Sequence, residues 1–329
     1  MASSPTSTVR RAELTGLSAH SRRQGGNVGS VNFSPFITSI SQSAHGQLKA
    51  DLVPSGLKGA AESIYQDSVA RADAMRLLAL LEPFLVTASE HLKSSCNSPR
   101  TTPILGPGAQ VNTAELRDIM IKVSNHSKRL TLREPRLLVL DSPCHVLGDL
   151  HGNLVDLNFF KTVLWPAGPS AAAGSFLFLG DFVDRGPDSI AVVAYVMAMK
   201  CLEPSRWWAI RGNHETREVN GNTDHYGTGS FLWQSREMFG EEGGHVVWEA
   251  VNGWFDALPL AATIDNAIFC VHGGIPQALC EGDATLDRIS QVPCPLQTAH
   301  SNQMVYDMLW SDPSTADQED TGEIGNGVS

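Results

Sequence analysis

Four short apolar segments in the centre of the chain each run directly into a cluster of glycine, acidic and histidine residues. The clusters lie at 148–153 (GDLHGN), 180–186 (GDFVDRG), 211–215 (RGNHE) and 272–274 (HGG). Helical patterns at 154–164 and 189–201 separate the first three, so the order is strand, helix, strand, helix, strand. That order predicts an α/β fold with a mainly parallel sheet. Because ligands bind beyond the carboxyl ends of parallel strands, the clusters are expected to converge on one site.

The side chains in these clusters are of the types that bind metals. Aspartate and histidine suit borderline transition metals, and asparagine offers an amide oxygen. Asp149 and His151 are two residues apart, so in an extended turn they can point to the same side. A carboxylate such as Asp181 can bridge two cations, and two metals about 3.5–4 Å apart clamp a phosphoryl group and lower the pKa of a bridging water. The clusters therefore predict two-metal phosphoryl chemistry without a nucleophilic side chain.

These motifs resemble those of the PPP family of serine/threonine protein phosphatases, within the calcineurin-like metallophosphoesterases. Further matches are Tyr226-Gly227, Leu258-Pro259, 268–270 (IFC) and 309–313 (LWSDP), and the similarity covers about residues 113–313. The resemblance implies an αββα sandwich that contains the mainly parallel half. It also implies hydrolysis of phosphoserine and phosphothreonine in proteins by a metal-bound hydroxide at a dinuclear metal centre.

The resemblance implies five metal ligands. Asp149, His151 and Asp181 would hold the first metal, and Asp181, Asn213 and His272 would hold the second. Manganese is the metal expected to support activity in vitro, with iron or zinc as alternatives. A hydrogen-bonded core histidine is the competing interpretation for His272.

Three further residues are expected to act on the substrate. By resemblance, His214 contacts the substrate and protonates the leaving oxygen, and Asp184 orients His214 and keeps it cationic. Arg185 is expected to bind phosphate oxygens with its planar guanidinium. The competing role for Arg185 is an ion pair with Asp184 or Asp188. The other charged residues of these motifs are interpreted as structural or surface groups: Asp188, Arg211, Glu215 and Arg217.

The rest of the chain is expected to precede this catalytic domain. Residues 1–60 are rich in Ser, Thr and Gly, hold four Arg and two Lys against two acidic residues, and are predicted to be a disordered tail. Residues 61–112 are predicted to form a helix (61–94), kinked or split by Pro83, and a linker. The catalytic domain is assigned to 113–329. It opens with a helix N-capped by Thr113 and contains a hairpin with an Asp265-Asn266 turn.

The family pattern continues beyond 309–313, with an arginine that binds phosphate and a histidine that completes the second metal site. Here Asn326 stands where the arginine is expected, and the histidine has no counterpart. The sequence is therefore expected to be a C-terminally truncated fragment, and a natural short variant with a weakened site is the alternative. Leu150, Asn153 and Phe182 replace the usual residues of their motifs, which indicates a divergent branch of the family.

Composition limits the partners and the location. The net charge of −11 disfavours duplex nucleic acid as the main partner. No apolar run approaches the ~20 residues of a membrane span. The six cysteines include no CxxC pair, which predicts a reducing compartment, cytoplasmic or nuclear. Arg10-Arg11 and Arg22-Arg23 leave an organelle-targeting peptide as an alternative. Phosphoprotein substrates and regulatory subunits are the expected partners.

Two other functions stay open. A pseudophosphatase that binds phosphorylated partners without turnover would fit the missing C-terminal ligands. A small-molecule phosphoesterase, such as a dinucleoside-polyphosphate hydrolase of the same superfamily, would fit the metal motifs. Tyr226-Gly227 and the 309–313 landmark favour a protein phosphatase over the second alternative.

Overall fold

The computed structural model describes residues 55–93, 102–106, 108–280 and 285–311, with side chains from Gln66 onward. The chain divides into two units, Met1–Pro54 and Ser55–Ser329, and only the second is described below. The predictions for the N-terminal tail, its arginine pairs, part of the linker, the end of the 309–313 landmark and Asn326 lie outside the described residues.

The first of two three-stranded sheets is parallel throughout. Its order is β2-β3-β4, with Cys144 opposite Ser175 and Phe176 opposite Trp207. The strands are linked by α4 and α5, which gives the predicted β-α-β-α-β half. The elements are β2 (Cys144–Leu147), α4 (Leu154–Leu164), β3 (Ser175–Phe178), α5 (Ser189–Leu202) and β4 (Trp207–Ala209).

The second sheet combines a parallel and an antiparallel pair in the order β1-β5-β6. Strand β1 (Leu137–Leu140) runs parallel to β5 (Ala261–Ile264), and β5 turns back into β6 (Ile268–Val271). The turn residues Asp265 and Asn266 have φ of 54° and 50°, and residues 265–267 separate the paired Ile264 and Ile268. The predicted hairpin is therefore confirmed, with a turn one residue longer than predicted.

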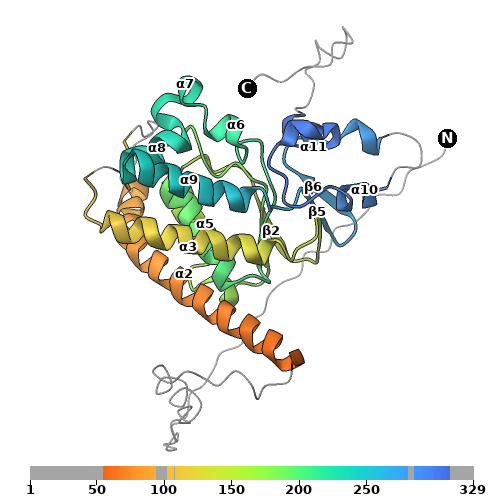
Figure 1. Cartoon of the computed structure of the whole chain (residues 1–329), viewed down its shortest axis with the longest axis horizontal. Helices are drawn as coiled ribbons and strands as arrows, with labels where there is room; N and C mark the ends of the chain where they lie inside the picture. The colour runs from red at the N-terminus through yellow and green to blue at the C-terminus, as the bar shows by residue number, and fades with distance from the viewer. Residues whose placement is uncertain (1–54, 94–101, 107, 281–284, 312–329) are drawn as a thin grey trace, which may run out of the picture. The chain divides into compact units, whose positions relative to one another are not determined.

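The two sheets pack against each other, and helices cover their outer faces (Figure 1). Leu138 and Ile264 of the second sheet share a buried cluster with Leu177 and Ile210 of the first. On the outer face of the second sheet lie α10 (Asp287–Ser290) and α11 (Gln303–Trp310). This layering is the αββα sandwich that the sequence predicts.

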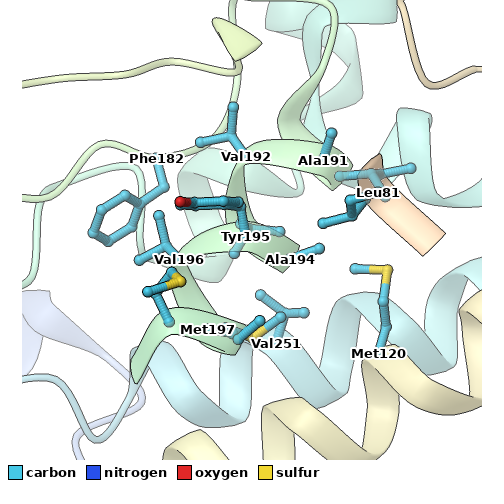
Figure 2. Close-up of a cluster of buried hydrophobic side chains, with 14 of the residues drawn as sticks. Leu81, Met120, Phe182, Ala191, Val192, Ala194, Tyr195, Val196, Met197 and Val251 are labelled. Carbon is cyan, nitrogen blue, oxygen red and sulfur yellow. The ribbon is translucent and has the colours of Figure 1, made fainter. Parts of the chain in front are cut away.

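Helix α5 forms the centre of the largest core. Every side chain from Ser189 to Cys201 is buried, so the helix is apolar on all sides, as expected for an element that other helices enclose. Figure 2 shows Tyr195, Val196 and Met197 of α5 facing Phe182 and Val251. The helices that contact α5 are α2 (Ser55–Lys93), α3 (Thr113–Thr131), α8 (Phe231–Phe239) and α4. Helix α9 (Glu241–Phe255) contributes Val251 to the same core.

Two details of the helices differ from expectation. Helix α2 continues through Pro83, so the predicted split is wrong. The buried side chains Leu81 and Leu85 on either side of Pro83 pack into the core, which stabilises the helix despite the lost hydrogen bond. The N-cap of α3 is Asn112 rather than Thr113, because the Asn112 side chain accepts the N–H of Glu115.

Four short 3-10 turns and two short α-helices complete the described elements. They are η2 (Pro169–Ala171), η3 (Gly227–Gly229), η4 (Gln277–Leu279), η5 (Ala299–Ser301), α6 (Arg217–Asn220) and α7 (Thr223–Tyr226). Among the helices of the described residues, none is both long and apolar enough to cross a membrane.

Candidate metal and phosphate site

Side chains that follow β2, β3, β4 and β6 meet around the carboxylate of Asp181. Nε2 of His151 lies 3.3 Å from one oxygen of Asp181, and Nε2 of His272 lies 3.4 Å from the other. Oδ2 of Asp149 is 3.8 Å from Nε2 of His151. Oδ1 of Asn213 is 3.1 Å from Nε2 of His272. The structure thus brings all five expected ligands together at the carboxyl ends of the strands.

The tautomers of the two histidines fit metal ions. Nδ1 of His151 lies 2.9 Å from the carbonyl oxygen of Val183, and Nδ1 of His272 lies 2.9 Å from that of Leu179. A carbonyl only accepts, so each Nδ1 carries the proton and a neutral ring presents a lone pair at Nε2. For His151, burial lowers the pKa to about 4 and keeps the ring neutral.

These lone pairs face acceptor oxygens, which is the arrangement that a cation stabilises. Without a cation, Nε2 of both histidines would repel the Asp181 carboxylate. Within the described part of the chain, two groups of three side chains have ligand atoms close enough to hold an ion, and Asp181 belongs to both. They are His151–Asp181–His214 and Asp149–Asp181–His272. The donor set therefore fits metal ions, with Asp181 in the shared position.

The buried carboxylate of Asp181 needs a positive charge nearby to stay ionised at neutral pH. The side chain is 3% exposed, and burial raises its pKa to about 8, with the carboxylates of Asp149 and Asp184 acting in the same direction. A bound cation would lower the pKa of Asp181, because it favours the ionised carboxylate.

At the site, four residues other than glycine have a positive φ, which such residues rarely adopt. Positive φ values occur at His151 (39°), Asp181 (53°), Asp184 (67°) and Arg185 (63°). Each such residue costs on the order of 1 kcal/mol or more, and such residues cluster where function requires an unusual geometry. Next to them, a Cβ on Gly180 would lie 2.3 Å from the Gly212 nitrogen, so only glycine allows the two turns to meet.

Glu215 holds these turns together. Its carboxylate accepts the N–H groups of Asp181 (2.6 Å), Phe182 (2.9 Å) and Gly212 (3.0 Å). Burial raises the pKa of Glu215 to about 8, and its hydrogen bonds to the amides of Phe182 and Asp181 oppose that rise. Glu215 is a structural group, as expected. The sequence did not show that the segment it supports is the turn that carries Asp181. Its position inside the 211–215 cluster was the sequence feature that could have indicated this role.

Arg211 and Arg217 also act structurally. Nε of Arg211 donates to the carbonyl oxygen of Glu215 at 2.9 Å, which supports the turn as expected. Arg217 pairs with Asp256 at 2.8 Å and with Glu249 at 3.2 Å.

His214 and Asp184 form a buried pair beside the ligands. Nδ1 of His214 lies 2.7 Å from Oδ2 of Asp184, whose other oxygen accepts the N–H of Phe231. Nε2 of His214 is buried, and within the described residues it has no hydrogen-bond partner. Burial lowers the pKa of His214 to about 3, with Arg185 and His272 acting in the same direction. The hydrogen bond to Asp184 orients the ring, whereas burial opposes the cationic form that Asp184 is expected to favour.

Arg185 lies at the rim of the site. Its side chain is exposed and hydrogen-bonds Tyr226, whose ring packs edge-on against that of His214 with centroids 5.2 Å apart. The guanidinium is thus within reach of an anion that enters toward His214, as the resemblance implies.

The fold is an α/β sandwich that holds a candidate metal site at the carboxyl ends of its strands. The sequence pattern of the family "Calcineurin-like phosphoesterase" matches residues 143–324, and the chain belongs to this family. The resemblance to the PPP phosphatases, expected from the motifs, is confirmed by this match and by the structural similarity that follows.

Two of the solved structures that resemble the chain are the following. One is a protein serine/threonine phosphatase from Saccharomyces cerevisiae with similarity to human phosphatase PP5. It is 27% identical with a TM-score of 0.51, over 61% of this chain and 60% of that one. The other is a cold-active protein-tyrosine phosphatase of a psychrophilic Shewanella species, 16% identical with a TM-score of 0.42, over 58% and 65%. The chain thus spans about three-fifths of the yeast protein.

Proposed function

We propose that this protein hydrolyses phosphoserine and phosphothreonine in proteins at a site that holds two metal ions. The observation that carries the proposal is the pair of histidine Nε2 atoms that face opposite oxygens of the buried Asp181 carboxylate. Support for a protein substrate comes from the yeast serine/threonine phosphatase, which is 27% identical. The choice among manganese, iron and zinc, the regulatory subunits and the cytoplasmic or nuclear location stay predictions.

Five side chains would hold the metals: Asp149, His151, Asp181, Asn213 and His272. Bound metal ions would offset the negative charge of the phosphate and supply a water of lowered pKa as nucleophile. The backbone carbonyls that accept from each Nδ1 fix both imidazole rings, as such outer partners do in metal sites. Glu215 fixes the turn that carries Asp181.

The remaining residues would act on the phosphate and the leaving group. Arg185 is placed to bind two phosphate oxygens with its guanidinium. His214, held at Nδ1 by Asp184, is placed to protonate the leaving oxygen from Nε2. The negative charge of a bound phosphate favours the cationic imidazole, which offsets the effect of burial.

The test is release of phosphate from phosphoserine and phosphothreonine peptides by the full chain with added manganese. Asp181→Asn should reduce kcat/KM by at least about 100-fold, because the shared ligand loses its charge. His214→Gln should reduce kcat by about 100-fold or more while peptide binding is retained. His300→Gln, an exposed histidine on η5, is the matched control and should keep full activity.

Three results would contradict the proposal. Turnover that survives Asp181→Asn would remove the metal site from the reaction. Phosphopeptide binding without turnover in the metal-loaded chain would favour the pseudophosphatase. Faster hydrolysis of diadenosine tetraphosphate than of any phosphopeptide would favour the small-molecule phosphoesterase.

A further inference from the structure

A pocket of about 340 Å³ lies directly beside Arg185. Its walls come from four places: the loop of Arg185 with the start of α5, the turn η3, the helix α8, and the segment 102–106 that precedes the catalytic core. Since Arg185 is the proposed phosphate group, a side chain close to a phosphorylated residue would reach this pocket. Three extended residues span about 10 Å.

The segment 102–106 is attached to the same loop that carries Arg185. Oδ1 of Asp188 accepts the backbone N–H groups of Ile104 and Leu105, and the N–H of Asp188 donates to the carbonyl oxygen of Gly152. Leu105 is only 2% exposed. The pocket is therefore a built feature, held by a buried carboxylate three residues from Arg185.

The floor and the rim of the pocket differ in chemistry. Ile190, Met238 and Leu105 form an apolar floor and are 2–7% exposed. The rim carries Trp233, which is 36% exposed, and the exposed carboxylate of Glu237. These two residues are four apart on α8 and so share one face of the helix. Within the described residues, Glu237 has neither a hydrogen bond nor an ion pair.

We propose that this pocket binds a lysine or arginine side chain of the phosphoprotein, within about three residues of the phosphorylated one. The inference rests on the proposed function, since it places the phosphate at Arg185. The aliphatic stem of the basic side chain would cover the apolar floor, and its charged end would lie between the Trp233 ring and Glu237. The net charge of −11 also attracts basic segments of a phosphoprotein to this chain.

Other types of side chain fit only part of the pocket. A neutral aliphatic side chain fills the floor but leaves Glu237 without a partner. An acidic side chain meets the Glu237 carboxylate and is repelled. The site therefore selects for a long side chain with a cationic end, by about tenfold over a neutral aliphatic side chain, the scale of one exposed ion pair and one cation–π contact.

The experiment measures binding, so it does not depend on turnover. Peptides of glycine and alanine carry one phosphothreonine analogue with an uncleavable C–P bond, and a single arginine is moved through the three positions on each side. At the best position, arginine is then replaced by norleucine or glutamate. For the full chain with manganese, Kd should be lowest for arginine, about tenfold higher for norleucine, and higher again for glutamate.

Variants assign the preference to the pocket. Glu237→Gln should reduce the preference for arginine over norleucine to about twofold, and Glu237→Lys should reverse it in favour of glutamate. Glu242→Gln, an exposed carboxylate at the start of α9, is the matched control and should leave it unchanged. All three variants should hydrolyse p-nitrophenyl phosphate as the parent does, because this small ester does not reach the pocket.

The outcomes separate the inference from the proposed function. Equal binding of the arginine and norleucine peptides, or an unchanged preference in Glu237→Lys, would overturn the inference even in an active enzyme. An arginine preference that reverses in Glu237→Lys would support it even if cleavable phosphopeptides were not turned over, and in that case only the proposed function would fail.

Discussion

At the scale of single residues, the site depends on the close approach of two turns. Glu215 joins the turn after β3 to the turn after β4, and Gly212 lies in the contact. A Cβ on Gly212 would lie 2.2 Å from an oxygen of Asp181 and 2.7 Å from the Asp181 nitrogen. The nitrogen is backbone, and the oxygen belongs to a short, buried side chain that also accepts the N–H of His214, so neither atom can move away freely. The sequence indicates the metal ligands, but it does not show which glycine a ligand touches, because that contact joins segments thirty residues apart.

Gly212→Ala should therefore displace Asp181 and weaken metal binding. We expect an increase of more than about tenfold in the Kd for manganese and a loss of about 1–3 kcal/mol in the free energy of unfolding. Calorimetric titration and urea unfolding measure the two quantities. Gly148→Ala is the matched control: it is next to Asp149, yet a Cβ there has no atom within 4 Å. Equal effects of the two substitutions would contradict the steric explanation.

At the scale of elements, the longer helices and the short strands were predicted well, whereas the four-residue helices were not. Helix α4 has the predicted bounds, and α5 differs from its prediction by one residue at its end. The Pro83 break was wrongly predicted, because tertiary packing of α2 overrides the local effect of proline. The short α6 and α10 were missed, since four residues carry no periodic signal. The candidate ligands were found because each follows a strand, whereas the role of Glu215 depends on contacts between elements.

The end of α5 offers a test of how these elements are held together. Lys200 is 1% exposed, pairs with Glu134, donates to the carbonyl oxygen of Trp207 at 2.9 Å and lies 4.6 Å from the Trp208 ring. Lys200→Met would leave the Glu134 carboxylate buried without its partner. We expect a loss of about 3–5 kcal/mol in the free energy of unfolding. Lys200→Met with Glu134→Leu should recover most of that loss, and Lys122→Met, an exposed lysine on α3, should have little effect.

This destabilisation should also depend on pH. Burial raises the pKa of Glu134 and Lys200 opposes the rise, so removing Lys200 raises it further. A raised pKa means that the folded state retains its proton when the unfolded chain has already lost it, so the stability falls as the pH rises. The difference between Lys200→Met and the parent should therefore be larger at pH 8 than at pH 5. A difference that is constant with pH would contradict the buried-carboxylate explanation.

At the scale of the whole molecule, the candidate metal site joins the two sheets. Asp181 and Asn213 follow strands of the first sheet, whereas His272 follows β6 of the second. A metal held by residues from both sheets restrains each sheet against the other. A ligand at about 100 times its Kd stabilises the folded state by about 2.7 kcal/mol. That stabilisation should be largest in the strands that the metal ligands follow.

Hydrogen exchange tests this coupling. Manganese should slow amide exchange in β6 by at least about tenfold, together with β3, while exchange in α2, which supplies no ligand, should change little. His272→Gln should remove the protection of β6 and leave part of the protection of β3, because Asp149, His151 and Asp181 remain. His300→Gln should retain both effects. Protection confined to the first sheet in the parent chain would mean that His272 is a core histidine rather than a ligand, and that the second sheet is held by packing alone.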